Sequence, residues 1–597
     1  MTTDIIPLEQ AKTLHGAFKE RVQRSPNATA FVQYEAASDQ WVEYSWQQTA
    51  DAIARWQAVM QSEALETGDR VAVMLRNCWE WVVFDQAALG LGLVTVPLYT
   101  NDRPDNIAYI LDHSDSKLLL IENNEQWVEL LSVADQLTGL ERIITLEPVV
   151  NRSGLPVVTV DDWLGDEHAE LVTADVPVDS LATIVYTSGT TGRPKGVMLS
   201  HHNILWNATA GLQTVDIYPT DVSLSFLPLS HTLERTVGYY LLILAGAQIT
   251  FARSIADLAE DLTIAKPTVL ISVPRIFERV YAKITEKLSH DSAVVQWLFK
   301  TTASTGLRRF EYEQKRGQWH YSMLFLPILE RLVSKKIQAK LGGRLRFAIS
   351  GGAALSPEIA KLFIGLGVPI QQGYGLTESS PIISVNRIGD NIPESIGPPL
   401  PGVEIKVGED DELLTRSPAV MLGYWKNQEA TDEVIDADGW LHTGDQVRIE
   451  EEHIFITGRL KEIIVMANGE KVSPADMEIA ISLDSAIEQV IVIGEKRPYL
   501  SALVVPNPEK LEEIAQDMHL DSHSKDFIKN PRLHERLLDI IHDRLRSFPG
   551  YAEVRRIGIV EEAWSIENGM MTPTMKLKRK RVLNKNSGLV KVLYSGH

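Results

Sequence analysis

The sequence predicts an α/β protein with a large N-terminal unit and a smaller, separate C-terminal unit. The chain has 597 residues, which is longer than one hydrophobic core usually organises. Residues 69–99 alternate strand and helix patterns, as is typical of βαβ units around a parallel sheet. A hairpin-like stretch after Ile449 then leads into about 135 residues with strand and helix signals of their own. These observations place a domain boundary near residues 459–461.

Seven short apolar runs are the strand candidates of the large unit. They cover residues 70–75, 93–98, 117–121, 183–187, 248–251, 269–273 and 345–350. Several of them end in loops rich in Gly, Ser or Thr. Ligands of open α/β sheets bind beyond the carboxyl ends of the strands, so we expect the chemistry in these loops.

Composition excludes several functional classes. Lys and Arg total 58 against 79 acidic residues, a net charge of −21, which opposes general binding to nucleic-acid phosphates. The one cysteine, Cys78, allows no intrachain disulfide and no multi-cysteine metal site. The start of the chain does not have the pattern of a secretory signal. We therefore expect a cytoplasmic protein.

One segment departs from the acidic background. Residues 300–346 contain eleven Lys or Arg and three Glu, a net charge of +8, interleaved with aromatic residues. This pattern has two interpretations: a helical insertion with a solvated charged face, or a basic, aromatic patch in contact with a membrane. Apolar runs such as residues 241–245 are too short to span a bilayer. Membrane contact would therefore be peripheral, on the inner face.

The strongest motif is YTSGTTGRPKGVMLSHHN, from Tyr186 to Asn203. Its run of hydroxyl and glycine residues lets backbone N–H groups crowd around anionic oxygens, and Lys195 adds a point charge. The pattern differs from the Walker P-loop because Gly196, not Ser or Thr, follows the lysine. A generic turn is the alternative interpretation. The candidate phosphate-binding residues are Thr187, Ser188, Gly189, Thr190, Thr191, Gly192 and Lys195.

This motif resembles the signature of the adenylate-forming superfamily, which includes acyl-CoA synthetases, peptide adenylation domains and firefly luciferase. Further matching blocks follow in the family's order: SGGAAL (350–355), QQGYGLTESSP (371–381), GYWKNQEAT (423–431), DGWLHTGD (438–445), GRLKEIIVMANGEKVSP (458–474) and MTPTMKLKRK (571–580). LPLSHTLERT (227–236) and the insertion after VPRIFERVY (273–281) resemble the long-chain fatty acyl-CoA synthetase branch in particular.

The resemblance implies a fold and a division into domains. The large unit, residues 1–457, would contain two layered βαβ subdomains and a small β-barrel. Residues 458–461 would form a hinge, with Lys461 at the hinge position. Residues 462–597 would form a small, mobile α+β lid.

The resemblance also implies catalytic roles. Lys576 matches the catalytic lysine that stabilises charge between the carboxylate and the α-phosphate, although a lysine in a basic tail is a rival interpretation. Glu378 matches the magnesium carboxylate, with Thr187 as a second contact. His231 aligns with a position between the acyl pocket and the thioester channel, or is a core histidine. Trp206 is either an acyl-tunnel gate or core.

The nucleotide contacts follow from the same blocks. Tyr374 resembles the adenine-stacking ring, and Asp445 resembles the acid that accepts the ribose hydroxyls. Arg459 resembles the hinge-proximal arginine that reaches the nucleotide. The remaining lining residues would be Gly352, Ala353, Gln372, Gly373 and Thr377. Gly469, in the Asn468–Glu470 loop, would border the channel for the pantetheine thiol after the lid rotates.

The predicted function is ATP-dependent activation of a long-chain fatty acid to acyl-AMP, followed by transfer to coenzyme A. ATP, Mg²⁺ and coenzyme A are the expected cofactors and co-substrates. An alternative acceptor is the phosphopantetheine of a carrier protein. A rival of another class is a non-enzymatic lipid-binding component. A homodimer is a further candidate assembly.

Overall fold

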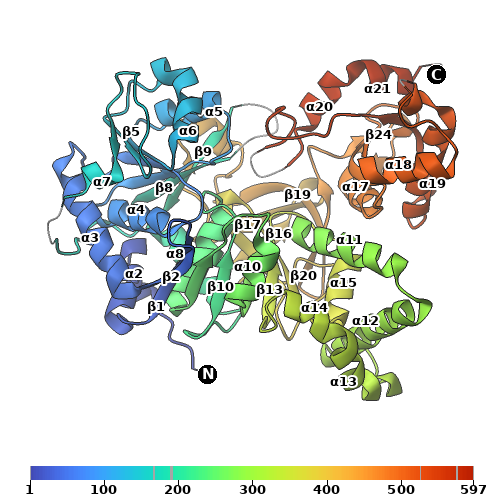
Figure 1. The fold of residues 1–597 in the computed structure, drawn as a ribbon, viewed down its shortest axis with the longest axis horizontal. Coiled ribbons are helices and arrows are strands. Elements are labelled where there is room, and N and C mark those ends of the chain that lie inside the picture. Colours follow the sequence, from blue (N-terminus) through green and yellow to red (C-terminus); the bar gives the residue numbers. More distant parts are fainter. Residues whose placement is uncertain (1, 166–168, 188–192, 525, 573–575, 596–597) are drawn as a thin grey trace.

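The computed structural model describes residues 2–165, 169–187, 193–524, 526–572 and 576–595. Figure 1 shows a large N-terminal part, blue to yellow, and a separate C-terminal part, orange to red, at the upper right. Among the described residues, no helix is long and apolar enough to cross a membrane.

The first large sheet has the strand order β18-β9-β8-β4-β3-β5-β6-β7. The strands from β8 to β7 are parallel, whereas β9 and β18 are antiparallel additions at one edge. The bounds are β3 Arg70–Met74, β4 Val94–Pro97, β5 Ser116–Ile121, β6 Arg142–Thr145, β7 Val157–Thr159, β8 Leu181–Thr187, β9 Lys195–Ser200 and β18 Gly423–Tyr424.

The second large sheet has the order β15-β14-β13-β12-β10-β11-β1-β2. It is parallel from β14 to β1, with an antiparallel strand at each edge. The bounds are β1 Thr29–Glu35, β2 Gln40–Ser45, β10 Val222–Ser225, β11 Gln248–Phe251, β12 Val269–Ser272, β13 Phe347–Ser350, β14 Ile370–Gly375 and β15 Ile382–Val385. All seven strand candidates are strands in these two sheets, so that prediction is confirmed.

Helices surround and join the two sheets. Ser45 and Ser200 begin two of them with capping boxes, which satisfy otherwise unpaired N–H groups. The helices before the insertion are α1 Leu8–Ala11, α2 Leu14–Arg24, α3 Trp46–Ser62, α4 Trp79–Gly90, α5 Pro104–His113, α6 Asn124–Leu130, α7 Val160–Trp163, α8 His201–Leu212, α9 Leu241–Ala245 and α10 Leu258–Ala265; η1 Leu131–Gln136 is a 3₁₀ helix and η2 Glu234–Tyr240 a π-helical segment.

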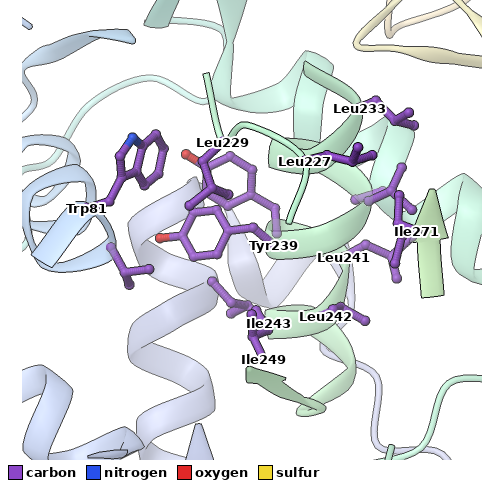
Figure 2. Packing of buried hydrophobic residues seen from close by; sticks show 14 of the residues in the cluster. Trp81, Leu227, Leu229, Leu233, Tyr239, Leu241, Leu242, Ile243, Ile249 and Ile271 are labelled. Atoms are coloured by element: carbon purple, nitrogen blue, oxygen red, sulfur yellow. The ribbon is translucent and has the colours of Figure 1, made fainter. Parts of the chain in front are cut away.

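The central core joins α4 to the η2–α9 segment. Figure 2 shows Trp81 facing Tyr239, whose ring centroid lies 5.8 Å away in an edge-to-face arrangement. Beside them the buried Arg235 guanidinium donates to Asp85 at 2.5 Å and to Thr183 at 2.7 Å. A buried charge pair that also satisfies hydrogen bonds fixes how its elements meet. The η2 segment, which closely follows His231 in the chain, is thereby held against α4 and β8 of the first sheet.

A four-stranded antiparallel sheet lies where the resemblance implies a small barrel. Its order is β16-β17-β19-β20, with bounds Glu404–Val407, Glu412–Arg416, Leu441–Glu450 and His453–Arg459. Ile396, Leu413, Val447 and Ile454 form its core. The predicted hairpin after Ile449 is the β19–β20 pair.

The C-terminal unit has its own core, which includes Met477, Ile481, Leu533 and Leu537. A three-stranded sheet, β23-β24-β25, and a two-stranded sheet, β21-β22, pack with helices. The bounds are β21 Ile464–Val465, β22 Lys471–Val472, α17 Pro474–Ser482, β23 Ile487–Ile493, β24 Leu500–Pro506, α18 Pro508–Asp517, α19 Pro531–Arg544, β25 Val554–Ile559, α20 Arg579–Lys585 and α21 Ser587–Leu593. The basic tail of the sequence forms the last two helices.

The basic segment is helical, as one of its two interpretations predicted. Its helices are α12 Ala293–Glu313, η3 Tyr321–Phe325, α13 Leu326–Leu329, η4 Glu330–Ser334 and α14 Lys335–Lys340. α11 Pro274–His290 precedes the segment and α15 Pro357–Gly365 follows it. Figure 1 shows α12 and α13 at the lower edge of the molecule.

Two buried histidines should make stability fall in mild acid. Burial lowers the pKa of His15 and His201 to about 4, and the Nδ1 of His201 accepts a hydrogen bond from the Leu14 N–H at 3.3 Å. Both stay neutral in the folded chain while the unfolded chain takes up protons below about pH 6.5. Stability should therefore fall as pH drops from about 6.5 to 4, by up to about 3 kcal/mol per histidine.

Urea unfolding of His201→Gln at several pH values tests this expectation. The variant keeps a hydrogen-bond acceptor but does not titrate, so its unfolding free energy should depend less steeply on pH than that of the wild type. The exposed His519 supplies the control His519→Asn, which should keep the wild-type slope. Parallel slopes for wild type and His201→Gln would contradict the assignment.

Candidate active site

The predicted phosphate-binding segment lies between two paired strands of the first sheet. Thr187 ends β8 and Lys195 begins β9, and the two residues are register partners. The Thr187 hydroxyl donates to the Lys195 carbonyl at 3.5 Å. The connecting candidates Ser188, Gly189, Thr190, Thr191 and Gly192 lie outside the described residues. The structure therefore describes the two ends of this loop.

Tyr424 connects this strand pair to Glu378. The Nζ of Lys195 lies 4.8 Å from the centroid of the Tyr424 ring, and the Tyr424 hydroxyl donates to Oε1 of Glu378 at 2.8 Å. Burial and the nearby Glu378 raise the pKa of Tyr424, which keeps the phenol protonated as a donor. β18 holds the ring in place because Tyr424 pairs with Val197 on β9. The sequence analysis found the block GYWKNQEAT as a family motif but did not predict that its Tyr424 links Lys195 to Glu378.

The donor set fits a magnesium ion shared with phosphate oxygens. Oε1 of Glu378 accepts from Tyr424, whereas no hydrogen bond within the described chain involves Oε2. No cluster of three His, Cys, Asp or Glu side chains suited to a metal occurs among the described residues. Magnesium commonly takes one or two protein oxygens and completes its shell with phosphates and water. Glu378 and the Thr187 hydroxyl are donors of this kind.

Tyr424→Phe should weaken the response to magnesium. The variant keeps the ring beside Lys195 but removes the hydrogen bond that orients Glu378, so we expect about a 3–10-fold higher magnesium requirement. Magnesium titration of fatty-acid-dependent pyrophosphate release measures this change. Tyr551→Phe, at an exposed tyrosine, is the control. An unchanged magnesium requirement would show that Tyr424 does not position the acid.

A second cluster joins Tyr374, Asp445 and Arg459. The Tyr374 hydroxyl, on β14, donates to Oδ2 of Asp445 at 2.6 Å, while Nε of Arg459 donates to Oδ1 at 2.8 Å. Asp445 and Arg459 are register partners on β19 and β20. Burial and the Asp445 carboxylate raise the pKa of Tyr374. An ionised carboxylate has about four acceptor sites, so Asp445 retains capacity for hydroxyl donors.

Lys576 reaches these clusters from the C-terminal unit. Its backbone N–H donates to the Thr572 hydroxyl at 3.0 Å. Lys576 is exposed overall, yet the protein around the ammonium group partly desolvates it and, with repulsion from Arg459, lowers its pKa. Asp445 and Glu378 act on it in the opposite direction. Lys576 therefore lies within electrostatic reach of both candidate carboxylates.

His231 interacts electrostatically with the same lysine. Burial, with a smaller contribution from Lys576, lowers the pKa of His231 to about 4. Its Nδ1 accepts the backbone N–H of Leu233 at 3.2 Å. The imidazole is thus neutral near pH 7, and its Nδ1 already accepts a hydrogen bond.

The other predicted nucleotide contacts surround these groups. Gly352 adopts φ +79° in the loop after β13, a conformation suited to glycine. Gln372 is occupied in shaping that loop, because its Oε1 accepts the Leu355 N–H at 3.1 Å and its Nε2 donates to Pro393. Ala353 follows Gly352, Gly373 lies on β14, and Thr377 begins the 3₁₀ turn η5 Thr377–Ser379 that carries Glu378.

Two candidates lie apart from this assembly. Lys461 is exposed, two residues beyond β20. Gly469 lies in the exposed turn between β21 and β22 with φ +87°, and an added Cβ would meet nothing within 4 Å. Neither residue is joined to Lys576, Glu378 or Asp445 in this arrangement. Trp206 packs on the cluster of Ala210, Ile383, Val385, Leu400 and Val403.

Comparisons with known proteins find family matches along most of the chain. A sequence model described as AMP-binding enzyme matches residues 18–425, and one described as AMP-binding enzyme C-terminal domain matches residues 461–597. The chain is 30% identical over 565 residues to the long-chain-fatty-acid–CoA ligase FadD15 of Mycobacterium tuberculosis, covering 93% of both chains. It is 29% identical over 597 residues to the chloroplastic long-chain-fatty-acid–[acyl-carrier-protein] ligase AEE15 of Arabidopsis thaliana, covering 89% of this chain and 80% of the relative.

Two solved structures share the fold. The anthranilate CoA ligase AuaEII in complex with anthranoyl-AMP superposes with a TM-score of 0.74 at 20% identity, over 98% of this chain and 99% of that one. The A domain of carboxylic acid reductase from Segniliparus rugosus, in complex with AMP and a co-purified carboxylic acid, gives 0.76 at 21% identity, over 99% and 97%.

Proposed function

The chain belongs to the AMP-binding enzyme family, and from this premise we propose that it activates a long-chain fatty acid with ATP and transfers the acyl group to coenzyme A. The products are acyl-CoA, AMP and pyrophosphate. The observations that carry the proposal are the two oriented carboxylates, Glu378 hydrogen-bonded by Tyr424 and Asp445 hydrogen-bonded by Arg459. The electrostatic interaction of both with Lys576 supports it. The full-length similarity to a long-chain-fatty-acid–CoA ligase supports the substrate class.

In the first half reaction, a fatty carboxylate oxygen attacks the α-phosphorus of ATP and pyrophosphate leaves. The product is a mixed anhydride, acyl-AMP. Negative charge gathers between the two reacting groups, and the Lys576 ammonium stabilises it as it develops. Lys195 and the residues of the 187–192 loop hold the departing phosphates. The neutral His231 borders the carboxylate without adding a second cation.

Glu378 and Thr187 would hold magnesium, which neutralises phosphate charge when bound. Tyr424 orients Glu378 for this role. Asp445, positioned by Arg459, accepts the ribose hydroxyls. Tyr374 packs beside the adenine, with Gly352, Ala353, Gln372, Gly373 and Thr377 lining the base and the α-phosphate.

In the second half reaction, the coenzyme A thiol attacks the acyl carbonyl and AMP leaves. We propose that the lid, residues 462–597, rotates about a hinge at residues 458–461, with Lys461 as the pivot. Lys576 then withdraws from the large domain, residues 1–457, and the turn at Gly469 borders the thiol channel. Lys461 and Gly469 are exposed and are not joined to Lys576, Glu378 or Asp445 in the arrangement described above. This supports a role for both residues in the second state.

The alternative acceptor is a carrier-protein phosphopantetheine. The similarity to an acyl-carrier-protein ligase favours testing it. Both acceptors present the same thiol, so the distinction rests on which partner saturates the enzyme.

The deciding experiment measures pyrophosphate release by the purified chain with ATP, magnesium and palmitate. Release should require palmitate and turn over with coenzyme A. Turnover with phosphopantetheinylated carrier protein but not with coenzyme A would identify the carrier protein as the acceptor. Palmitate binding without pyrophosphate release would instead establish a lipid-binding protein.

Two further partners belong to the proposal. We place the chain in the cytoplasm, with residues 300–346 in peripheral contact with the inner face of a membrane. The second partner is another copy of the chain in a homodimer, which sedimentation velocity tests directly.

A further inference from the structure

The helical insertion exposes a concentration of large apolar side chains. Ten of them between residues 294 and 332 are solvent-exposed: Val294, Val295, Trp297, Tyr312, Trp319, Tyr321, Leu324, Phe325, Ile328 and Leu332. Single exposed apolar residues are ordinary on a protein surface, whereas clustered ones mark an interaction site.

The middle of this set forms one helical face. Tyr321, Leu324, Phe325 and Ile328 follow the spacing of adjacent helical turns and are 65%, 68%, 58% and 61% exposed. Leu326 and Leu329, in the same segment, are buried against the protein. The η3–α13 segment therefore has two apolar faces, of which one packs against the protein and the other is exposed to solvent. We call the exposed one, with Leu332, the apolar face.

Basic residues continue and surround the apolar face. Arg331, Lys335 and Lys336 are exposed and extend the same helical spacing into η4 and α14. Eight cations of the 300–346 segment form no ion pair within the described chain: Lys300, Arg308, Lys315, Arg331, Lys335, Lys336, Lys340 and Arg344. The segment carries +8 in a chain of net charge −21. An apolar strip bordered by unpaired cations complements an anionic bilayer surface.

The insertion is fixed firmly to the large domain. Gly306 on α12 faces Gly365 on α15 so closely that a Cβ on Gly306 would lie 1.9 Å from the Gly365 carbonyl oxygen. After α12, Arg316 donates to Asp390 at 2.6 Å, and Gln314 accepts the Asn391 N–H at 2.8 Å. The apolar face is therefore presented by a rigid support.

We infer that the apolar face and its cations dock the protein onto an anionic phospholipid bilayer. The side chains from Tyr321 to Leu332 enter the headgroup boundary while Arg331, Lys335 and Lys336 contact lipid phosphates. Binding by the same face of a second copy is disfavoured because two segments of +8 would then meet. This inference rests on the peripheral contact proposed above and does not depend on the catalytic assignment.

Vesicle co-sedimentation of the full chain, without ATP or fatty acid, tests the docking face. Wild type should bind phosphatidylcholine vesicles that contain phosphatidylglycerol and bind pure phosphatidylcholine at least about tenfold more weakly. Binding should weaken by about tenfold or more between about 0.05 and about 0.5 M salt. The triple variant Leu324→Ser, Phe325→Ser, Ile328→Ser should lose at least about tenfold in partitioning.

A matched control separates this face from general surface hydrophobicity. Val128→Ser, Val150→Ser, Val592→Ser changes residues that are 56%, 64% and 62% exposed elsewhere, and it should bind vesicles as wild type does. Lys335→Glu, Lys336→Glu should weaken binding to anionic vesicles about tenfold and leave the weak binding to neutral vesicles unchanged.

Three results would overturn the inference. The first is no sedimentation of wild type with anionic vesicles, and the second is equal binding by the triple variant and its control. The third is a lipid-independent wild-type dimer that the triple variant abolishes. The last result would assign the face to a second copy of the chain. Palmitate-dependent pyrophosphate release in detergent should be the same for wild type and triple variant, which verifies folding and tests the catalytic proposal separately.

Discussion

Lys576→Ala should abolish acyl-adenylate formation while leaving thioester formation from supplied acyl-AMP intact. The Lys576 ammonium group, which the C-terminal unit supplies, interacts electrostatically with both Glu378 and Asp445. Removing a group that stabilises charge in a transition state typically costs about 10²–10³-fold in rate. Pyrophosphate release in the first half reaction and acyl-CoA formation in the second measure the two steps separately.

The control for Lys576 comes from the same basic tail. Lys580 is also exposed and lies on α20, shortly after Lys576 in the chain. A specific role for Lys576 predicts that Lys580→Ala retains both half reactions. Equal losses in Lys576→Ala and Lys580→Ala would support the tail interpretation that the sequence left open. Loss of both half reactions in Lys576→Ala alone would contradict a role confined to the first step.

The direction of the lysine pKa adds a pH signature. Because desolvation lowers the pKa of Lys576, the ammonium form should be lost at a lower pH than in an ordinary lysine. Adenylation should then slow as pH rises toward that pKa, and Lys576→Arg, which stays protonated, should lack this alkaline decline. The thioester half reaction should not share it.

The sequence predicted most of the fold because local signals and spatial structure agree there. The seven strand candidates are apolar runs that end in turn residues, and each became a strand. What could not be predicted is long-range pairing. β1, near the start of the chain, pairs with β11, and Phe31 lies opposite Ile249. No local pattern in either segment specifies that partner.

The candidate site also contains residues that local motifs predict and residues whose role depends on long-range contacts. Motif blocks pointed to Glu378, Asp445 and Lys576 as candidates, and in the folded chain Lys576 interacts electrostatically with both carboxylates. Tyr424 was missed because its importance comes from contacts with Lys195 and Glu378, which only the folded chain creates. Composition revealed the charge of the insertion, whereas the exposure of its apolar residues depends on which helical face packs against the protein.

Gly469→Leu should have the opposite effect to Lys576→Ala. In the present arrangement a Cβ added at this position meets no atom within 4 Å, and the turn is exposed, so the large-domain site and adenylation should be preserved. After the proposed rotation the same turn borders the thiol channel, where a branched side chain would displace the incoming thiol. Misplacing a reacting group by about 1 Å can cost about 10²-fold.

Backbone strain must be separated from obstruction in this test. Gly469 has φ +87°, which disfavours every side chain that has a Cβ. Gly469→Ala has the same strain with little bulk and is therefore the matched control. A thioester rate that falls about 10²-fold further in Gly469→Leu than in Gly469→Ala, with equal adenylation rates, would support a two-state lid. Equal losses in both variants would place the turn outside the thiol channel, because obstruction depends on side-chain size. A loss of adenylation would do the same, because obstruction acts only after the lid has rotated.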